Sequence, residues 1–578
     1  MRLVVLREIP EDESLRRDWN ALVERTPQPQ VFYTYEWAFA VQRSYGETLR
    51  PLIFLAYDEG DSLCGVAALA TSRPGESVSF LCATTGDYCD FLSLRENREA
   101  FVAAVVGELR HENMSGATLT NLPADSATVA ALRHAARSRG YQYFARTAYI
   151  CAQVSLASLQ RRGENKPVLP RKKMLRRFLN AMGREAPVRL EHARSWSQAE
   201  PVLPGFIEAH IARFLVTGRI SNMVREQRRL FLAQLAKLLA ERGWFALTIF
   251  VAGQQVFAWN YGFQFLDTWF WYQPTFDSDF EKYSPGFCLL AKLIEEAADR
   301  PELRTVDLGL GAEEYKERFA NQTRETLYIT LNRSYPKHVR EIAHYYAAAA
   351  LKVLPYAERV VRSVLAKCGT LRQRLRKSGI WETFRWAARR MRYSVAGRDE
   401  VFFYELTHPD PSFLALDGVC LKPLDLNALA RAAMQNENDE GTLAYLLRCA
   451  EHLRNKDWEG FGLVNHGGEF LHFTWAGPFE GFHWSELNST LEPPAPQSLI
   501  LFDSWTPVSQ RGRGYYAPTI AMVADKARAE GKRAWGFSAS TNTTSVRGLE
   551  KAGFKRQFSV IRYRVLWWQR VIQEKPGS

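Results

Sequence analysis

The sequence lacks any long hydrophobic run. Nowhere in its 578 residues does an apolar stretch reach the roughly 18 residues that a membrane-spanning helix needs. The chain opens on MRLVVLREIPEDE, where a short apolar run is followed at once by acidic residues, unlike a secretory signal peptide. We therefore expect a cytoplasmic protein with no transmembrane anchor.

Clustered cysteines are also missing. The eight cysteines are scattered singly, and they form no Cys-x-x-Cys pair and no Cys/His cluster at the spacing of a zinc site. Even the nearest pair, Cys82 and Cys89, does not resemble a metal motif. We expect reduced thiols, mostly buried, and no metal in the function.

Charge of one sign dominates a single segment. The net charge of +12 and the isoelectric point near 9.2 would suit nucleic acid or an anionic membrane as a partner. Residues 333–395 hold 15 Lys and Arg against 3 Asp and Glu, an excess as large as that of the whole chain. Trp381 and Trp386 lie among these arginines at helical spacing. Such a basic amphipathic helix predicts peripheral contact of residues 336–395 with an anionic membrane, and the alternative is a solvated helical linker.

The length predicts several modules, because one hydrophobic core does not serve 578 residues. Hydrophobic residues make up 46% and charged residues 24%, which is ordinary for a globular protein. Helix and strand patterns alternate along the chain and predict an α+β fold of mixed, largely antiparallel sheets flanked by helices. We expect modules at residues 1–160, 161–335 and 399–578, with the basic helical linker at 336–398.

The most informative stretch runs from Leu499 to Phe554. It reads as a buried strand to Trp505, a basic glycine loop, a helix, a second strand at 534–539 and a short helix that ends near Gly553. The first helix is indicated by an apolar stripe of Ile520, Val523, Ala524 and Ala527.

The glycine loop suits an anion. Gly512 and Gly514 let backbone N–H groups turn inward, the helix behind them adds its positive end, and Arg511 and Arg513 add charge. Such a loop can hold a pyrophosphate. The alternative is a plain surface turn with two arginines.

Together these motifs resemble the signature of the GNAT N-acyltransferase superfamily, an Arg-x-x-Gly-x-Gly/Ala loop followed by Asn-x-x-Ser and Gly-Phe. The resemblance implies acetyl-coenzyme A, or another acyl-coenzyme A, as cosubstrate, with no metal. It implies that the cosubstrate is held by Arg511, Gly512, Arg513, Gly514, Tyr515, Asn542 and Ser545. Two positions depart from the pattern. Tyr516 stands where a small residue is usual, and Leu549 stands where many members carry a tyrosine that protonates the leaving thiolate.

The N-terminal part, to about Ser334, resembles the FemAB-like branch of the superfamily, which packs two such modules together. Within that branch it is similar to acetyltransferases associated with bacterial cellulose and exopolysaccharide synthesis. The resemblance rests on Gly86-Asp87-Tyr88-x-Asp90, His210, Ser284-Pro285-Gly286 and Asp307-x-Gly309-x-Gly311-x-Glu313-x-Tyr315-Lys316. It implies an acyl donor at Ser284 and Gly286, catalytic roles for His210 and Asp307, and substrate binding by Asp87, Asp90, Glu313, Tyr315 and Lys316.

Each of these residues also has a purely structural interpretation. Asp87 and Asp90 can shape a turn through Asx hydrogen bonds. His210 lies among apolar residues and can be a core histidine, and Asp307 with Lys316 can be a structural ion pair.

Transfer from a thioester to an amine needs a held donor, a route for the amine proton and a partner for the developing oxyanion. In the C-terminal module Glu486 and Asp503 are the candidate bases, although carboxylates often only face solvent. We predict an acyl-coenzyme A-dependent N-acyltransferase acting on a saccharide or other amine acceptor of the bacterial envelope or an exopolysaccharide precursor. The alternatives are a FemAB-type transferase using aminoacyl-tRNA, the one case with a nucleic-acid partner, and a scaffold that has lost its chemistry.

Overall fold

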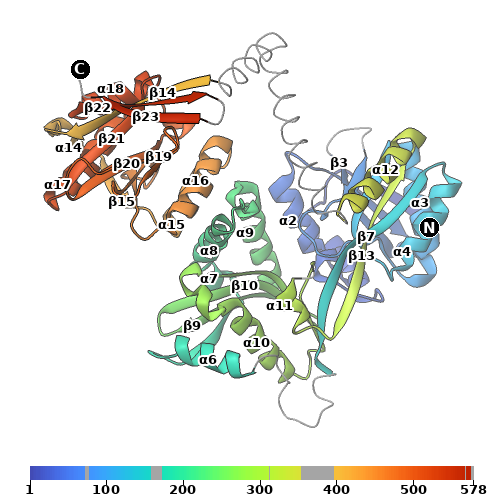
Figure 1. Ribbon diagram of the computed structural model, residues 1–578. Helices are drawn as coiled ribbons and strands as arrows, with labels where there is room; N and C mark the ends of the chain where they lie inside the picture. The colour runs from blue at the N-terminus through green and yellow to red at the C-terminus, as the bar shows by residue number, and fades with distance from the viewer. Residues whose placement is uncertain are drawn as a thin grey trace. The chain divides into compact units, whose positions relative to one another are not determined.

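The structure, a computed structural model, describes residues 1–71, 77–157, 172–311, 313–352, 396–414, 416–565 and 568–574 (Figure 1). Its contacts define two compact units. The first contains Met1–Arg213 and Arg225–Ala349, and the second contains Phe214–Val224 and Ala350–Ser578. Most of the basic segment expected to contact a membrane, residues 353–395, lies outside the described residues. Within the described part of the chain, no helix has the length and apolar character to cross a membrane.

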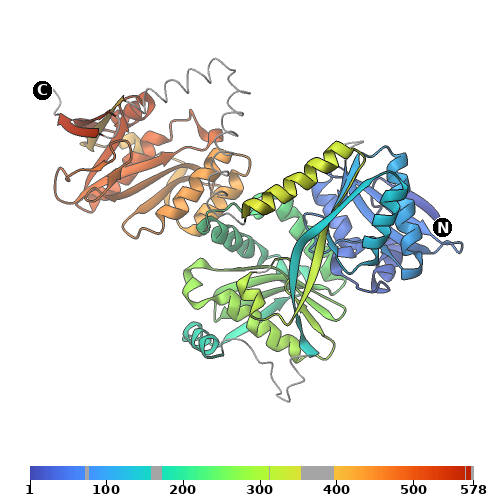
Figure 2. The same cartoon turned by 45° about the vertical axis from the view of Figure 1, so that its right-hand side comes forward.

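One 13-stranded sheet runs through the first unit, and Figure 2 gives a second view of it. Its neighbouring strands are antiparallel except for the β4–β6 and β11–β12 pairs. The order is β1 (Arg2–Leu6), β2 (Arg50–Tyr57), β3 (Leu63–Thr71), β4 (Val78–Phe80), β6 (Gly116–Pro123), β13 (Gln322–Asn332), β7 (Gln142–Ser155), β12 (Thr305–Asp307), β11 (Thr268–Phe276), β10 (Gln255–Phe265), β9 (Phe245–Ala252) and β8 (Val188–Ala193), with β5 (Leu92–Ser93) beside β3.

The two halves of this unit share strands. β13 comes from the second half but lies between β6 and β7 of the first half. β7 is 14 residues long and pairs with β13 along most of its length. Its last residues also pair with β12, where Val154 lies opposite Val306. The sheet therefore continues across the module boundary expected near residue 160. Where the two halves meet, Tyr88 and Gln153 of the first half hydrogen-bond to Asp307 of the second.

Helices cover the sheet of the first unit. They are α1 (Glu13–Glu24), α2 (Tyr35–Tyr45), α3 (Arg98–His111), α4 (Ala127–Ser138), α6 (Lys172–Met182), α7 (Trp196–Ala199), α8 (Leu203–Val216), α9 (Glu226–Glu241), α10 (Pro285–Ala298), α11 (Glu314–Glu317) and α12 (Tyr335–Lys352). α10 follows β11 in the chain, and its start lines a cavity described below. Proline at its first position presets the backbone, and Leu289, Leu290, Leu293 and Ile294 pack into the core.

The second unit contains an eight-stranded sheet. Its order is β15 (Val419–Pro423), β16 (Glu459–Asn465), β17 (Phe470–Pro478), β20 (Ser498–Trp505), β21 (Arg533–Ala539), β14 (Ala396–Leu406), β22 (Phe554–Val565) and β23 (Trp568–Glu574). A small hairpin joins β18 (His483–Trp484) to β19 (Ser489–Thr490). The helices are α14 (Pro411–Leu414), α15 (Leu426–Gln435), α16 (Glu440–His452), α17 (Tyr516–Ala529) and α18 (Thr543–Lys551).

The predicted order of elements after Leu499 is confirmed. The apolar stripe expected on the first helix is buried as the inner face of α17. β20 and β21 run in parallel but pair only from Ser498–Leu501 to Arg533–Gly536. Beyond that point β20 bulges against β17, and Asp503 takes a left-handed backbone with φ of 43°. The predicted fold class, mixed and largely antiparallel sheets flanked by helices, is confirmed in both units.

Candidate functional sites

In the first unit, β11 and β12 separate after a short parallel pairing of Thr268–Phe270 with Thr305–Asp307. A cavity of about 270 Å³ lies along the diverging end of β11 and the start of α10, and we call it the α10 cavity. It brings together three residues singled out in the sequence, Ser284, Gly286 and Tyr315. The other lining residues are Met174, Arg213, Trp271, Pro274, Thr275, Phe276, Glu281, Phe287 and Arg318.

The start of α10 presents hydrogen-bond donors to this cavity. Ser284 takes a left-handed backbone, with φ of 47° and ψ of 56°, and its side chain does not cap the helix. The first N–H groups of a helix have no partner within it, and they attract anions. Thr275 also lines the cavity. It is 1% exposed, and its hydroxyl has no hydrogen-bond partner among the described residues. The start of α10 thus offers backbone donors at the cavity, and an unpartnered hydroxyl is buried in its wall.

An acidic cluster forms where the two halves of the unit meet. The Asp307 carboxylate accepts hydrogen bonds of 2.8 Å from the Tyr88 hydroxyl, the Gln153 amide and the Gly309 N–H. The buried Lys316 ammonium donates to the Leu310 carbonyl at 2.8 Å, and it pairs with Glu313 at 2.7 Å. Asp307 is thus fully engaged by its neighbours.

Asp87 reaches this cluster from the first half of the chain. A Cβ added to Gly309 would lie 2.5 Å from its Oδ2, so the carboxylate rests directly against that glycine. Burial, reinforced by the Asp307 carboxylate, raises the pKa of Asp87 to about 7, although Lys316 and Arg228 act in the opposite direction. A carboxylate with this pKa can take up a proton near neutral pH.

Two other predicted residues lie in the interior. Asp90 accepts hydrogen bonds from the Ser126 and Thr128 hydroxyls, both at 2.6 Å, and from the Phe91 N–H at 2.7 Å. His210 is 4% exposed, and burial lowers its pKa to about 3, with Arg213 contributing. A histidine with that pKa is a poor base at neutral pH. The structure favours the structural interpretation of both residues.

In the second unit, the predicted anion loop has the expected backbone. Gly512 and Gly514 have φ of 79° and 81°, and the loop is exposed and leads directly through Tyr515 into α17. Arg511 donates to the Thr506 carbonyl at 3.1 Å and lies over the Trp505 ring. Asn542 caps α18 by accepting from the Ser545 N–H at 3.2 Å.

Tyr516 fills the space beside this loop. Its hydroxyl lies 3.2 Å from the Ser545 hydroxyl, and its ring centroid lies 5.6 Å from that of His472 on β17. A Cβ added to Gly548 of α18 would be 2.3 Å from the Tyr516 ring. Leu549, at the position where a thiolate acid was expected, is 1% exposed in the core. Tyr516 thus packs against α18 and β17 at the start of α17.

We expect Gly548→Ala to destabilise the protein by about 1–3 kcal/mol, because the new methyl group overlaps the Tyr516 ring. The same substitution in a Tyr516→Ala background should cost much less. Chemical denaturation of the four proteins of this double-mutant cycle measures the coupling. Equal costs in the two backgrounds would contradict the contact.

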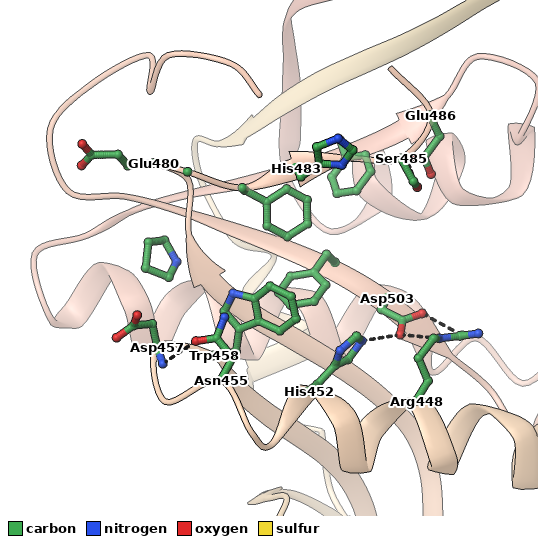
Figure 3. A pocket seen from close by; sticks show the side chains of 15 residues that line it. Arg448, His452, Asn455, Asp457, Trp458, Glu480, His483, Ser485, Glu486 and Asp503 are labelled. Carbon is green, nitrogen blue, oxygen red and sulfur yellow. Dashed lines mark hydrogen bonds and ion pairs between the residues drawn. The ribbon is translucent and has the colours of Figure 1, made fainter. Parts of the chain in front are cut away.

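A second cavity, of about 700 Å³, lies between α16, the bulge of β20 and the β18–β19 hairpin, and we call it the α16 cavity. Figure 3 shows Asp503 in it, held by two side chains of α16. Arg448 donates to both oxygens of Asp503, at 2.9 and 3.0 Å, and His452 Nε2 lies 2.8 Å from Oδ2. Sequence reasoning missed Arg448 and His452, although their spacing of four residues places them on one helix face.

These contacts decide what Asp503 can do. Burial alone would raise its pKa, but the hydrogen bonds from His452 and Arg448 lower it below the usual value. Asp503 is therefore a weak base that orients its two partners. The other candidate, Glu486, is exposed, accepts from the Ser485 hydroxyl at 3.0 Å, and lines both the α16 cavity and a neighbouring cavity of about 670 Å³.

Comparison with known proteins identifies one part of the chain. Residues 170–317 match the model of a family described as acetyltransferase (GNAT) domain. This range contains β11, β12 and α10, and it confirms the predicted superfamily for that part. A search of curated proteins gave no match.

Among solved structures, the chain is similar to FemX, with a TM-score of 0.39 and 9% identity over 59% of this chain and 99% of that one. It is also similar to a tandem GNAT protein from the clavulanic acid biosynthesis pathway, with a TM-score of 0.34 and 13% identity over 57% of this chain and 98% of that one. For L-PGS from Bacillus licheniformis the TM-score is 0.34 and the identity is 8%, over 51% of this chain and 91% of that one.

Proposed function

We propose that this chain, whose residues 170–317 form an acetyltransferase domain of the GNAT family, transfers an acyl group from acyl-coenzyme A to an amine. The observation that carries the proposal is the α10 cavity. Within the family-matched segment it combines an uncapped helix start with a buried, unpartnered Thr275 hydroxyl. These groups fit a ligand with anionic and hydrogen-bond-accepting parts, as a coenzyme A thioester has.

The donor would lie at Ser284 and Gly286, and when bound it supplies the activated thioester. The α10 start offers backbone N–H groups to its phosphates, and Trp271 and Tyr315 form the apolar wall, joined by a hydrogen bond of 3.3 Å. We place the donor here rather than at Arg511–Gly514 because the bulky Tyr516 side chain, packed against Gly548 and Ser545, follows that second loop.

Asp87 would accept the proton of the attacking amine. It has the near-neutral pKa that this role needs, and it lies at the seam where β12 ends. Asp307 and Lys316 would position the loop and set the charge around Asp87. His210, Asp90, Glu486 and Asp503 would have no part in the transfer.

The acceptor of the acyl group is an amine in this proposal. The sequence resemblance supports a saccharide-borne amine of the bacterial envelope or of an exopolysaccharide precursor as the acceptor. The basic composition of residues 336–395 supports peripheral contact of the protein with a membrane. The tRNA-dependent alternative predicts that aminoacyl-tRNA, rather than acyl-coenzyme A, supplies the acyl group. A gel-shift experiment with charged tRNA tests it directly.

Calorimetric titration of the full chain with acetyl-coenzyme A tests the donor site. We expect Thr275→Val to weaken binding about three- to tenfold, because one hydrogen bond is lost. The free energy of unfolding of this variant should equal that of the unaltered protein or exceed it by up to ~1 kcal/mol. The reason is that an unpaired buried hydroxyl is replaced by an isosteric methyl group.

Arg511→Glu is the matched control for that titration, and it should leave the affinity unchanged. The reverse pattern, with Arg511→Glu weakening binding and Thr275→Val without effect, would move the donor to the second unit. If the full chain binds no acetyl-coenzyme A at all, the proposed function is wrong.

A further inference from the structure

The hairpin of β22 and β23 carries exposed apolar side chains on one face (Figure 1). Val565, the last residue of β22, is 51% exposed, and Trp568, the first residue of β23, is 53% exposed. The two are direct cross-strand partners, so their side chains share a face. Tyr563, two residues earlier on β22, lies on the same face and is 38% exposed. We call Tyr563, Val565 and Trp568 the hairpin patch, and such a contiguous exposed group is typical of a surface that binds a partner.

Arginines lie behind the apolar end of the hairpin patch. Arg398 of β14 and Arg570 of β23 both pair with Tyr563, one from each side. The patch therefore ends in an apolar row, and a row of Arg398, Tyr563 and Arg570 follows two residues further in, which is about 7 Å along a strand. Both arginines are exposed. The Arg398 guanidinium lies 3.4 Å from Glu400, and Arg570 forms no ion pair with any residue that the structure describes.

The basic segment of the chain reaches the second unit at this same end. β14 begins at Ala396, which pairs with Val565, so the chain enters the sheet directly beside the hairpin patch. Residues 333–395, which immediately precede Ala396, hold 15 Lys and Arg against 3 Asp and Glu. Within the unit, residues 396–398 and 563–570 contain three arginines and no acidic residue. Exposed apolar surface and positive charge thus occur together at one end of the sheet.

A lipid bilayer with anionic headgroups matches both properties. Tryptophan and tyrosine favour the boundary between headgroups and acyl chains. An interfacial element inserts its apolar face by roughly 5–10 Å, which is similar to the spacing of the two rows. Arginines one row behind the apolar end would then reach the lipid phosphates. Two copies of this chain that met through the hairpin patch would instead bring the same arginines together, and like charges at an interface repel.

We propose that the hairpin patch inserts into the surface of an anionic membrane. Val565 and Trp568 lie at the acyl-chain boundary, and Arg398 and Arg570 lie among the phosphates. This assigns membrane contact to a folded surface of the second unit, in addition to the contact proposed above for residues 336–395 from their composition. The proposal does not depend on where, or whether, acyl transfer occurs.

Co-sedimentation of the full chain with lipid vesicles tests the hairpin patch. We expect binding to vesicles of phosphatidylcholine mixed with phosphatidylglycerol, weaker binding to phosphatidylcholine alone, and a decrease on addition of sodium chloride. The Val565→Ser/Trp568→Ser variant should weaken binding to the anionic vesicles by about tenfold or more, because it removes most of the inserted apolar surface. The Arg398→Gln/Arg570→Gln variant should weaken it about tenfold and reduce its dependence on salt.

Tyr149→Ser/Val508→Ser is the matched control, because it removes an aromatic residue and a valine of comparable exposure outside the hairpin. It should bind the anionic vesicles as tightly as the unaltered protein does, and melting curves verify that all variants are folded. Acetyl-coenzyme A titration of the same proteins is a separate readout, so this proposal and the proposed function can fail independently.

The proposal is wrong if the full chain does not bind the anionic vesicles. It is also wrong if both hairpin variants bind them as tightly as the control does, and the contact would then belong to residues 336–395 alone. Sedimentation velocity without lipid examines self-association. A dimer that the Val565→Ser/Trp568→Ser variant dissociates, with unchanged vesicle binding, would identify the hairpin patch as an interface between two copies instead.

Discussion

Asp87→Asn should lower kcat for acyl transfer by about 10²–10⁴-fold, the usual contribution of a general base. The amide cannot accept a proton, yet it has almost the same shape as the carboxylate. The pH profile gives a more specific readout. Since Asp87 must be deprotonated to act and its pKa is about 7, activity of the unaltered protein should rise with pH through neutrality and then level off. Residual activity of the variant should lack this rise.

Lys316→Gln tests how a neighbouring charge sets the pKa of Asp87. The Lys316 charge lowers the pKa of Asp87, so its removal should raise that pKa and shift the rise in activity toward higher pH. Steady-state rates of both variants, measured over the same pH range with saturating acyl donor, separate the effects. An Asp87→Asn variant that keeps full activity and the same pH profile would exclude Asp87 as the proton acceptor.

Gly309→Ala is expected to have the second-largest effect, on both activity and stability. Gly309 has φ of 72°, a conformation that costs alanine about 1–2 kcal/mol. Its added methyl group would also lie 2.5 Å from the Asp87 carboxylate, which must then move. We expect kcat to fall by at least tenfold, because small displacements of a catalytic group are costly. Kinetics together with thermal unfolding measure the two effects.

Gly311→Ala separates displacement of Asp87 from backbone strain. Gly311 also has a positive φ, of 94°, but its added methyl group would meet the Glu313 carboxylate at 3.3 Å instead of Asp87. It should lose similar stability and keep most of the activity. If both variants lose activity equally, strain in the loop explains the loss, and the contact with Asp87 does not.

Local patterns in the sequence determined much of the second unit. The apolar stripe from Ile520 to Ala527 and the glycines at 512 and 514 predicted a buried helix behind a turned loop, and both are observed. The same holds for the short helix that ends near Gly553. Such features depend on residues within a turn or two of one another, so helical periodicity and glycine conformation are sufficient to predict them.

Contacts between distant segments were decided by the tertiary structure alone. The sequence showed Tyr516 as an unusual residue, but only the fold places its ring on Gly548. The fold also pairs Asp503 with Arg448 and His452, so that the carboxylate of this candidate base is held by two hydrogen-bonding partners. In the first unit, β13 crosses into the first half of the sheet and the seam brings Asp87 against Gly309.

The physical reason is that a side chain's pKa and accessibility depend on burial and on neighbouring charges. Asp87, Asp90, Asp307 and Asp503 are the same residue type in the sequence, each beside a turn or at the end of a strand. Packing raises the pKa of Asp87 to about 7 and commits Asp90 and Asp307 to hydrogen bonds in the interior. It pairs Asp503 with the Arg448 guanidinium. The sequence by itself determined which residues were candidates, and long-range packing decided the burial and the partners of each.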